Sequence, residues 1–236
     1  MKKNNFWKNK TIFITGIAGF VGSNLAKSLI NDGAKIVGLT RSKKVDSLLY
    51  FEKLDRNIDL IFGEITNKEL LAGIFLKYPI DVCFHLAAQV EVGLAYKYPF
   101  LTWETNIRGT YTLLEAIRES KKKVRSIIIA SSDKAYGEYP LKKLPYKENY
   151  ELKAQFPYDT SKACADMIAK SYSNKLFKLP IVITRFANIY GPGQLNFSAL
   201  VPDAIKSCLL NKKFIVRSDG EAIRDFIYIK DITDLY

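Results

Sequence analysis

The sequence contains one histidine, His85, and three cysteines, Cys83, Cys164 and Cys208, among 236 residues. A single histidine leaves little material for a metal cluster or for a serine, histidine and acid triad, so we expect no metal site. We interpret His85 as a buried, hydrogen-bonded side chain in preference to a catalytic one. The cysteines are odd in number, far apart and without metal-ligand spacing, which is typical of buried thiols in a reducing compartment.

Long apolar runs are also lacking. No run reaches the roughly 18 to 20 residues of a membrane helix, and the charged start, residues 1–10, is not followed by the apolar stretch of a secretion signal. We therefore expect a cytoplasmic protein that makes no membrane contact. With 48% hydrophobic and 25% charged residues, the composition is typical of an ordinary folded domain.

The formal net charge of +12 raises the question of a nucleic-acid partner. Clustered lysine and arginine would indicate such a binder, but the lysines are dispersed in short groups such as 43–44, 121–123, 142–143 and 212–213. We expect a solvated basic surface and no nucleic-acid groove. The excess of positive charge weakly favours a small anionic substrate.

Short apolar, β-branched runs alternate with helical patterns along most of the chain. This alternation predicts an α/β fold with a Rossmann-type, doubly wound parallel sheet. The predicted strands of the sheet are 11–15, 35–40, 58–62, 81–86, 127–130 and 180–186. The later predicted elements are a helix at 197–210, strands at 214–217 and 224–229, and a helix that begins near 231.

A glycine-rich turn follows the first predicted strand. Gly16, Gly19 and Gly22 separate that strand from a helix, and the second strand follows on schedule. In such a βαβ unit the glycines let the backbone approach a pyrophosphate at the positive end of the helix. The second strand ends at residues 40–43, where there is no acid for the ribose of NAD, so we predict NADP, with NAD possible. A merely solvated Arg41 is the competing interpretation.

The apolar strand 127–130 ends abruptly at polar and ionisable residues. Ser131 to Lys134 follow it directly and would lie beyond the carboxyl end of a strand, where ligands collect in an open parallel sheet. Tyr158 and Lys162, at the start of a later predicted helix, are four residues apart and so share one helical face. We expect these two side chains to act together.

The order of these features resembles the extended short-chain dehydrogenase/reductase family of sugar-nucleotide epimerases and dehydratases. The further marks of the resemblance are His85-Leu86-Ala87-Ala88, Asn106, Ser131-Ser132, Tyr136-Gly137, Arg185 through Pro192, and Arg224-Asp225-Phe226 with Tyr228 and Asp231. The resemblance covers essentially the whole chain. It implies a cofactor-binding domain at 1–184, a partial substrate-binding lobe at 185–236, and a homodimer formed through the helices that contain 106–119 and 158–177.

The resemblance also implies roles for the catalytic and cofactor-binding residues. Tyr158 would be the acid and base on the sugar 4-hydroxyl, with a pKa lowered by Lys162 and by the nicotinamide charge. Ser132 would hydrogen-bond the same oxygen. The implied cofactor contacts are Gly16, Gly19, Phe20, Val21, Gly22, Arg41, Glu64, Ile65, Leu86, Ala87, Ala88, Tyr158 and Lys162.

The implied substrate is a nucleotide-diphosphate hexose. Asn188 and Arg224 would meet its diphosphate, because a guanidinium fork suits phosphate oxygens. Val201 and Pro202 would pack against its nucleobase. An ordinary surface ion pair with Asp225 is the competing interpretation of Arg224.

Asp133 and Lys134 bear on the reaction type. A 4-epimerase needs only oxidation, rotation and reduction at the sugar 4-position, whereas a 4,6-dehydratase also needs an acid and a base for elimination of water. We assign the acid to Asp133 and the base to Lys134, a pair that resembles the CDP-glucose 4,6-dehydratases. A solvated pair at a turn, a 4-epimerase, and an NADP-binding fragment or paralogue without turnover stay open as alternatives.

Overall fold

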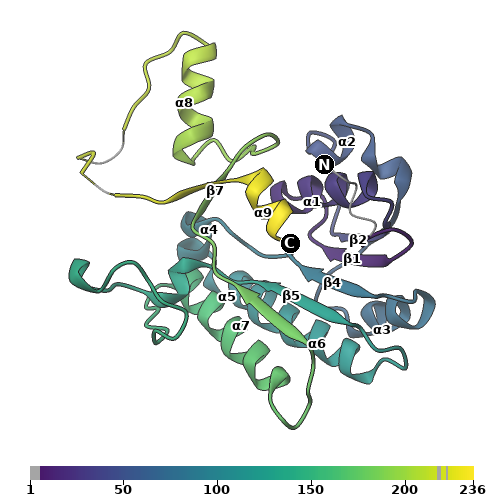
Figure 1. The fold of residues 1–236 in the computed structure, drawn as a ribbon. Coiled ribbons are helices and arrows are strands. Elements are labelled where there is room, and N and C mark those ends of the chain that lie inside the picture. The colour runs from purple at the N-terminus through teal and green to yellow at the C-terminus, as the bar shows by residue number, and fades with distance from the viewer. Residues whose placement is uncertain (1–5, 217–218, 222) are drawn as a thin grey trace.

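The computed structural model describes residues 6–216, 219–221 and 223–236. Its centre is a six-stranded parallel sheet with the strand order β3-β2-β1-β4-β5-β6 (Figure 1). The strands are β1 (Thr11–Thr15), β2 (Lys35–Thr40), β3 (Ile58–Phe62), β4 (Val82–His85), β5 (Ser126–Ala130) and β6 (Ile181–Thr184). The predicted doubly wound α/β fold is thereby confirmed, although β4 and β6 are shorter than expected.

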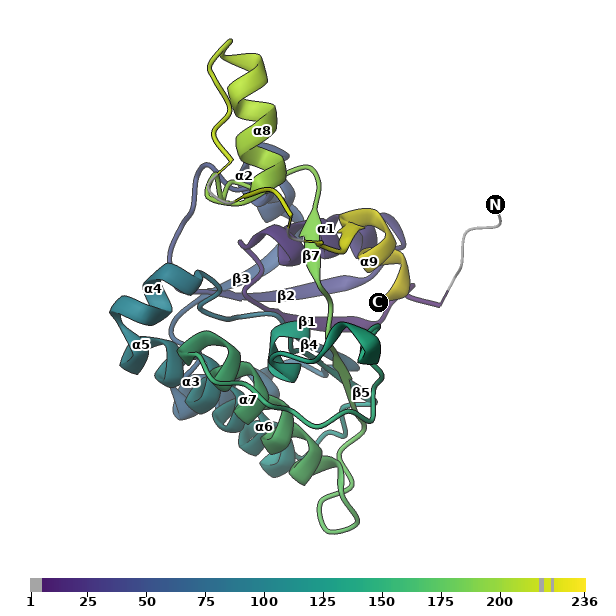
Figure 2. The same ribbon diagram turned by 90° about the vertical axis from the view of Figure 1, so that its left-hand side faces the viewer.

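Helices cover both faces of the sheet (Figure 2). One face carries α3 (Lys68–Lys77), α6 (Gly109–Glu119) and α7 (Pro157–Ser173), and the other carries α1 (Phe20–Asn31), α2 (Leu48–Phe51) and α9 (Ile229–Leu235). No helix in the described part of the chain is both long and apolar enough to cross a membrane.

The strands are mainly apolar because each face of the sheet has its own core. In β1, Phe13 joins the core beneath α3 and α6, whereas Ile12 and Ile14 join the core beneath α1. In β5, Ile127 joins the core beneath α3 and α6, and Ile128 joins the core beneath α1. Successive side chains of a strand point to opposite faces, so a strand that is covered on both sides must be mainly apolar along its whole length.

The helix expected to contain 106–119 is part of three consecutive segments. They are α5 (Pro99–Trp103), a π-helical turn (η2, Glu104–Arg108) and α6. The preceding α4 (Val92–Lys97) was not predicted. Pro99 begins α5, because proline lacks an N–H and suits the first position of a helix. The π-helical turn carries the buried Asn106, and such turns are frequent at functional sites.

Beyond β6 the chain leaves the sheet and later returns to it. The elements are β7 (Asn188–Tyr190), α8 (Leu200–Leu209), β8 (Phe226–Tyr228) and α9. The strands β7 and β8 pair in parallel as a separate two-stranded sheet, and α8 projects away from the main sheet (Figure 1). The strand predicted at 214–217 is wrong for residues 214–216, which are irregular, and Arg217 lies outside the described residues. The sequence did not predict β7, because its three residues run directly into Gly191-Pro192.

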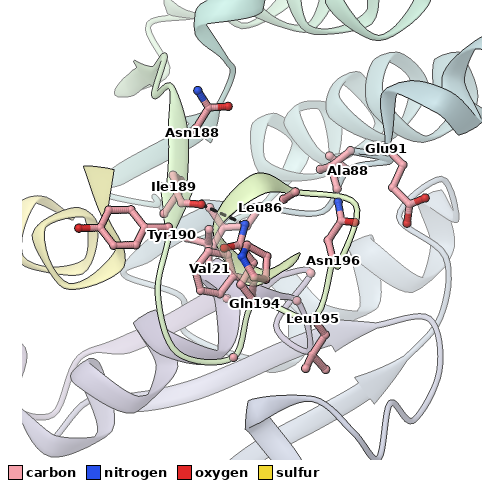
Figure 3. A pocket seen from close by; sticks show the side chains of 18 of the residues that line it. Val21, Leu86, Ala88, Glu91, Asn188, Ile189, Tyr190, Gln194, Leu195 and Asn196 are labelled. Atoms are coloured by element: carbon pink, nitrogen blue, oxygen red, sulfur yellow. Dashed lines mark hydrogen bonds between the residues drawn. The ribbon is translucent and has the colours of Figure 1, made fainter. Parts of the chain in front are cut away.

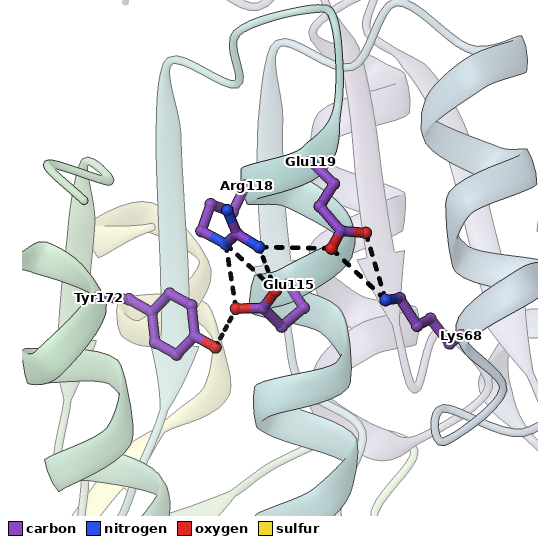
Figure 4. Close-up of polar contacts among 5 residues, drawn as sticks. All are labelled: Lys68, Glu115, Arg118, Glu119 and Tyr172. Carbon is purple, nitrogen blue, oxygen red and sulfur yellow. Dashed lines mark hydrogen bonds and ion pairs between the residues drawn. The ribbon is translucent and has the colours of Figure 1, made fainter.

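A chain of polar contacts links three helices on one face of the sheet (Figure 4). Arg118 of α6 pairs with Glu115 (Nη2–Oε2 2.6 Å), and Glu119 pairs with Lys68 of α3 (Oε2–Nζ 3.4 Å). Tyr172 of α7 donates a hydrogen bond to Glu115. Ion pairs this exposed contribute little stability singly, but the contact with Tyr172 helps to hold α7 beside α6.

Candidate functional site

A cleft of about 1620 Å³ opens beyond the carboxyl ends of the strands. The strand order reverses between β1 and β4, and this reversal is where ligands bind in doubly wound sheets. The predicted site residues that line the cleft are Gly16, Gly19, Phe20, Val21, Gly22, Arg41, Glu64, Ile65, Leu86, Ala87, Ala88, Ser132, Asp133, Lys134, Tyr158, Asn188, Val201, Pro202 and Arg224. The exception is Lys162, which is buried.

The glycine turn packs too closely against its neighbours to carry side chains. Gly16 has a φ of +70°, and a Cβ at this position would lie 2.8 Å from the Cα of Ala87. A Cβ on Gly22 would lie 2.5 Å from the Gly16 carbonyl oxygen. The first turn of α1, whose N–H groups have no partner within the helix, therefore opens directly on the cleft. This cradle fits the pyrophosphate of a dinucleotide.

A buried hydrogen-bonded chain runs through His85. Thr110 donates to the Asn106 carbonyl oxygen (Oγ1–O 2.6 Å), so it accepts from His85 Nε2 (3.1 Å). His85 Nδ1 then accepts from Thr15 Oγ1 (2.8 Å), which in turn accepts from the Ala87 N–H (3.1 Å). Burial, and secondarily the charge of Lys162, lower the pKa of His85 to about 3. The prediction of a buried, hydrogen-bonded His85 is confirmed.

Asn106 continues this chain toward the start of α7. Its Oδ1 accepts from the Gln89 N–H (2.8 Å), and its Nδ2 donates to Ser161 Oγ (2.8 Å). Ser161 donates to the Tyr158 carbonyl oxygen (2.6 Å). Asn106 therefore joins the segment after β4 to the turn of helix that carries Tyr158. From the sequence we assigned no role to Ser161. Its position between Tyr158 and Lys162 in the same helix could have indicated one.

The turn after β5 carries three of the predicted catalytic groups. Ser132 caps the short helix at Asp133–Tyr136 (η3), where its Oγ accepts from the Lys134 N–H (3.2 Å) and donates to Asp133 Oδ1 (3.0 Å). Ser132 also lies close enough to the Tyr158 hydroxyl to lower its pKa. One short turn thus brings a hydroxyl, a carboxylate and an ammonium to the side of the cleft where Tyr158 lies.

We expected a lowered pKa for Tyr158, but the groups that the protein itself supplies raise it. The pKa of Tyr158 is raised to about 12, chiefly by burial; Ser132 opposes this rise, and the Asp133 and Asp159 carboxylates contribute to it. The ammonium of Lys162 is buried and donates to the Ala130 carbonyl oxygen (Nζ–O 2.8 Å), and it is not among the groups that shift the pKa of Tyr158. Burial in turn lowers the pKa of Lys162 to about 8.

Asp159 is an ionisable group of this site that sequence reasoning missed. It lies in the first turn of α7 and is largely buried. Burial raises the pKa of its carboxyl group, Lys134 opposes that change, and Asp133 adds to it. An acid in the first turn of a helix has the ordinary function of complementing the helix dipole, which is why the sequence alone gave no reason to single it out.

The wall formed by the segment between β7 and α8 was also missed. Gln194, Leu195 and Asn196 line the cleft, and Figure 3 shows them with Val21 and Ala88. Gln194 Nε2 donates to the Ile189 carbonyl oxygen (3.1 Å), while its buried Oε1 has no hydrogen-bond partner among the described residues. That oxygen is an acceptor available to a bound ligand.

The predicted substrate residues lie on the same side of the cleft. Asn188 Nδ2 donates to the Asp225 carbonyl oxygen (3.0 Å), which ties β7 to the segment before β8. Arg224 is exposed, and its Nη1 donates to the Ile223 carbonyl oxygen (3.0 Å). Its guanidinium retains further N–H groups that can face the cleft.

Residues 12–236 match the model of the NAD dependent epimerase/dehydratase family. The chain belongs to this family. The cradle of Gly16 and Gly22, the first turn of α1 and the nearby alanines fit the dinucleotide that the family name implies. The resemblance drawn from the sequence is thereby confirmed, and the chain is a member of an enzyme family of nucleotide-sugar metabolism.

The relatives of this epimerase/dehydratase chain include enzymes of both kinds. It is 34% identical to a dTDP-D-glucose 4,6-dehydratase of Dictyostelium discoideum and 30% identical to a CDP-glucose 4,6-dehydratase of Salmonella typhimurium. These matches cover 95% and 92% of the chain but only 54% and 63% of the relatives. The chain thus spans less than two thirds of the length of either relative.

Solved structures show the same division. A UDP-glucose 4-epimerase of Thermotoga maritima, in complex with UDP-glucose, superposes with a TM-score of 0.86 at 30% identity and covers 95% of this chain and 71% of its own. A dTDP-glucose 4,6-dehydratase of Bacillus anthracis, in complex with NAD, superposes with a TM-score of 0.82 at 30% identity and covers 95% and 69%. Epimerases and dehydratases match this chain about equally well.

The depressed pKa of Lys162 predicts how stability depends on pH. Below about pH 8 the lysine is protonated in both states, so the folded protein bears the full cost of a buried charge. Between pH 8 and its ordinary value of 10.5, the folded protein releases a proton that the unfolded chain keeps, and stability rises. We expect Lys162→Met to be the more stable protein at pH 7, by at most roughly 3 kcal/mol, and to lose this advantage by about pH 10.5. Urea unfolding of both proteins across this range measures the difference, and a difference that stays constant or grows with pH would contradict the assignment.

Proposed function

We propose that this chain carries the active site of a nucleotide-sugar 4,6-dehydratase. The observation that supports this choice is the turn after β5, where Asp133 and Lys134 are held beside Ser132 and line the same cleft as Tyr158. A dehydratase has work for both ionisable groups, whereas a 4-epimerase has work for neither. The similarity to dTDP-D-glucose and CDP-glucose 4,6-dehydratases is consistent with this reading.

In this mechanism, Tyr158 and Ser132 act at the sugar 4-hydroxyl. Tyr158 exchanges the proton of that hydroxyl while Ser132 orients its oxygen. When bound, the oxidised nicotinamide supplies hydride transfer and a positive charge that lowers the pKa of a nearby phenol. Since the pKa of Tyr158 is about 12, chiefly through burial, the phenol stays protonated at neutral pH until such a charge is present. Lys162 and Asn106 fix the helix turn from which Tyr158 projects.

The elimination is assigned to Asp133 and Lys134. Once the 4-position is a ketone, the proton on the neighbouring carbon is acidic, and neutral Lys134 removes it. Protonated Asp133 gives its proton to the departing 6-hydroxyl, which leaves as water; the hydride taken from the 4-position would then return to the 6-position, and the proton held by Lys134 to the 5-position. Asp159 interacts with both groups: burial raises the pKa of its carboxyl group, Lys134 lowers it and Asp133 raises it.

We also propose a division of labour along the chain. Residues 1–184 hold the cofactor, through the glycine turn and through Glu64, Ile65 and residues 86–88. Residues 185–236 hold a nucleotide-diphosphate hexose: Asn188 and Arg224 contact its diphosphate, and Val201 and Pro202 pack against its nucleobase. All of these residues line the one cleft, which supports a single site for both molecules.

A nucleotide-sugar 4-epimerase is the second candidate function. It is favoured by the superposition on the UDP-glucose 4-epimerase of Thermotoga maritima. In that case Ser132 and Tyr158 would act as above, while Asp133 and Lys134 would be solvated residues of the turn. A chain that binds the cofactor without turnover is the third possibility.

The decisive experiment is product analysis by mass spectrometry with UDP-glucose, dTDP-glucose and CDP-glucose. We expect one of these substrates to give a product that is lighter by one water and that absorbs in alkali as a 4-keto-6-deoxy sugar. Tyr158→Phe should reduce the rate of turnover by about a hundredfold or more, and Lys134→Met should reduce the rate of formation of the dehydrated product by a similar factor. Neither variant should lose cofactor by fluorescence titration.

Lys142→Met is the matched control, because Lys142 lies on the exposed loop outside the cleft lining. It should turn over like the wild type. A product of unchanged mass with inverted configuration at the 4-position would establish the epimerase instead. The absence of any product with all three substrates would favour the cofactor-binding chain.

We propose NADP(H) as the preferred cofactor. Thr40, Arg41, Ser42 and Lys44 line the cleft at the end of β2 and include two cations and no acid. A guanidinium binds a ribose 2′-phosphate with charge-assisted hydrogen bonds. Asp46 also lines the cleft and is an acid that could bind a ribose hydroxyl instead.

Fluorescence titration tests this preference. We expect NADPH to bind more tightly than NADH, and Arg41→Ala to weaken NADPH by about tenfold to a hundredfold with little change for NADH. Arg125→Ala is the control, since Arg125 is exposed and lies outside the cleft lining. Equal affinities for the two cofactors, or tighter binding of NADH, would overturn the proposal and favour NAD.

We further propose a homodimer through the outer faces of α6 and α7. Tyr111 of α6 is 40% exposed and Met167 of α7 is 62% exposed, so each of these two packed helices presents a large apolar side chain to solvent. Light scattering should give the mass of two chains for the wild type and of one chain for Tyr111→Glu with Met167→Glu. Leu141→Glu, at an exposed loop position, should remain dimeric. A monomeric wild type would disprove the interface.

A further inference from the structure

Arg185 directly follows β6 and does not line the cleft, yet its guanidinium makes several hydrogen bonds. Its Nε and Nη2 bond the two carboxylate oxygens of Asp166 in α7 (2.6 and 3.1 Å). Its Nη1 donates to the Tyr136 hydroxyl (2.7 Å) and to the Glu148 carbonyl oxygen (3.1 Å). The guanidinium therefore joins α7, the end of the η3 turn and the loop that follows it.

The contact with Asp166 fixes Arg185 to the catalytic face of α7. Tyr158, Lys162 and Asp166 are spaced four residues apart, so they lie in a row along one face of the helix. Asp166 is fully buried, and its planar carboxylate accepts both bonds of the guanidinium fork, which defines the direction as well as the distance of the contact. Any displacement of Arg185 relative to α7 would break both bonds of the fork and leave this buried carboxylate with only its ion pair to Lys170 (Nζ–Oδ1 3.2 Å).

The contact with Tyr136 fixes the other end of the same link. Tyr136 is the last residue of η3, the turn that begins with Asp133 and Lys134. Its ring lies 4.9 Å from the guanidinium carbon of Arg185 and stacks on Tyr146 at 4.8 Å between centroids. Tyr136 is buried and does not line the cleft. Its hydroxyl is thus placed to hold the turn and not to touch a substrate.

The two ends of the turn are attached to the same strand. At the start of the turn, the Ser131 N–H donates to the Thr184 carbonyl oxygen (2.8 Å) and the Asp133 N–H to the Phe186 carbonyl oxygen (3.3 Å). These two residues flank Arg185 in the sequence, and Arg185 holds the end of the turn through Tyr136. The backbone thus anchors Asp133, and the side chain of Arg185 anchors the residues that follow it.

We propose that Arg185, bound to Asp166 and Tyr136, is a positioning residue that holds the Asp133–Lys134 turn in register with Tyr158 on α7. Elimination requires the turn to present its acid and base to a sugar whose 4-hydroxyl is held by Tyr158. Small errors in such placement reduce the rate steeply. The direction of the kinetic effect rests on the proposed dehydratase function, whereas the structural effect does not.

Tyr136→Phe tests the link with the smallest change. The variant keeps the ring, its stacking on Tyr146 and its position beside the guanidinium, and removes the oxygen that accepts from Arg185. We expect kcat to fall by about ten- to a hundredfold, while KM for the nucleotide sugar and the affinity for the cofactor stay within about twofold of wild type because neither Tyr136 nor Arg185 lines the cleft. Arg185→Lys should cause the same kinetic change, and the double variant should be no worse than the more affected single one.

Hydrogen exchange measured by mass spectrometry reads the turn without any substrate. The N–H groups of residues 133, 134, 135 and 137 are all bonded within the turn or to β6. In Tyr136→Phe we expect the peptide that covers 131–137 to exchange about tenfold faster, with no change in peptides from β1 and α1. Tyr172→Phe is the matched control: it removes a hydroxyl bond from the far end of α7, and should alter neither kcat nor exchange at 131–137.

Faster exchange at 131–137 together with a reduced kcat supports the proposal. An unchanged kcat overturns it, whether or not exchange changes, because the register of the turn would then not matter to the reaction. If the wild type turns over none of the three nucleotide sugars, the proposed function fails, and exchange alone decides whether Arg185 holds the turn: unchanged exchange in Tyr136→Phe overturns the link.

Discussion

The buried hydrogen-bonded chain through His85 is the interaction on which the arrangement of the cleft depends. It begins at the backbone of Leu86 and Ala87, runs through Thr15 and His85 to Thr110, and reaches the carbonyl group of Asn106. The side chain of Asn106 extends it to α7. The glycine turn touches Ala87, and Tyr158 lies in the first turn of α7. The two halves of the cleft are thus placed by one continuous set of polar contacts.

Such a chain is stable only if every member is satisfied, because an unpaired polar group in a low-dielectric interior is costly. The neutral form of His85 meets this condition, as one ring nitrogen accepts and the other donates. A protonated His85 would place two donors against Thr15 and Thr110, and one of those hydroxyls would have to abandon its own acceptor. This explains why burial and the nearby ammonium of Lys162 keep the ring uncharged.

Much of the fold could be predicted because its signals are local. The apolar strands and the glycine turn have patterns that follow directly from burial on two faces and from close backbone approach. The π-helical turn at Asn106 and the three-residue β7 could not be predicted in this way, since each depends on a partner that is distant in the sequence: Ser161 for the first and β8 for the second.

The candidate site shows the same limit. Most of its residues could be located from motifs, but their protonation could not. The pKa of Tyr158 depends on how deeply the ring is buried and on two carboxylates, one of which belongs to Asp159. The ammonium of Lys162 was expected to act on Tyr158, yet it bonds the carbonyl group at the end of β5. Spacing along a helix shows which side chains share a face, but not which atom each one finds there.

The chain returns to the main sheet at α9, and this return allows one wall of the cleft to change in length. Ile229 and Ile232 of α9 are buried, and Tyr236 bonds Thr184 at the end of β6 (Oη–Oγ1 2.9 Å). The segment between β7 and β8 is therefore closed at both ends by fixed contacts, and the entropy cost of closing such a segment grows only slowly with its length. Insertions and deletions there would leave the glycine turn and α7 undisturbed, so this wall of the cleft can change in length while the opposite wall keeps its packing.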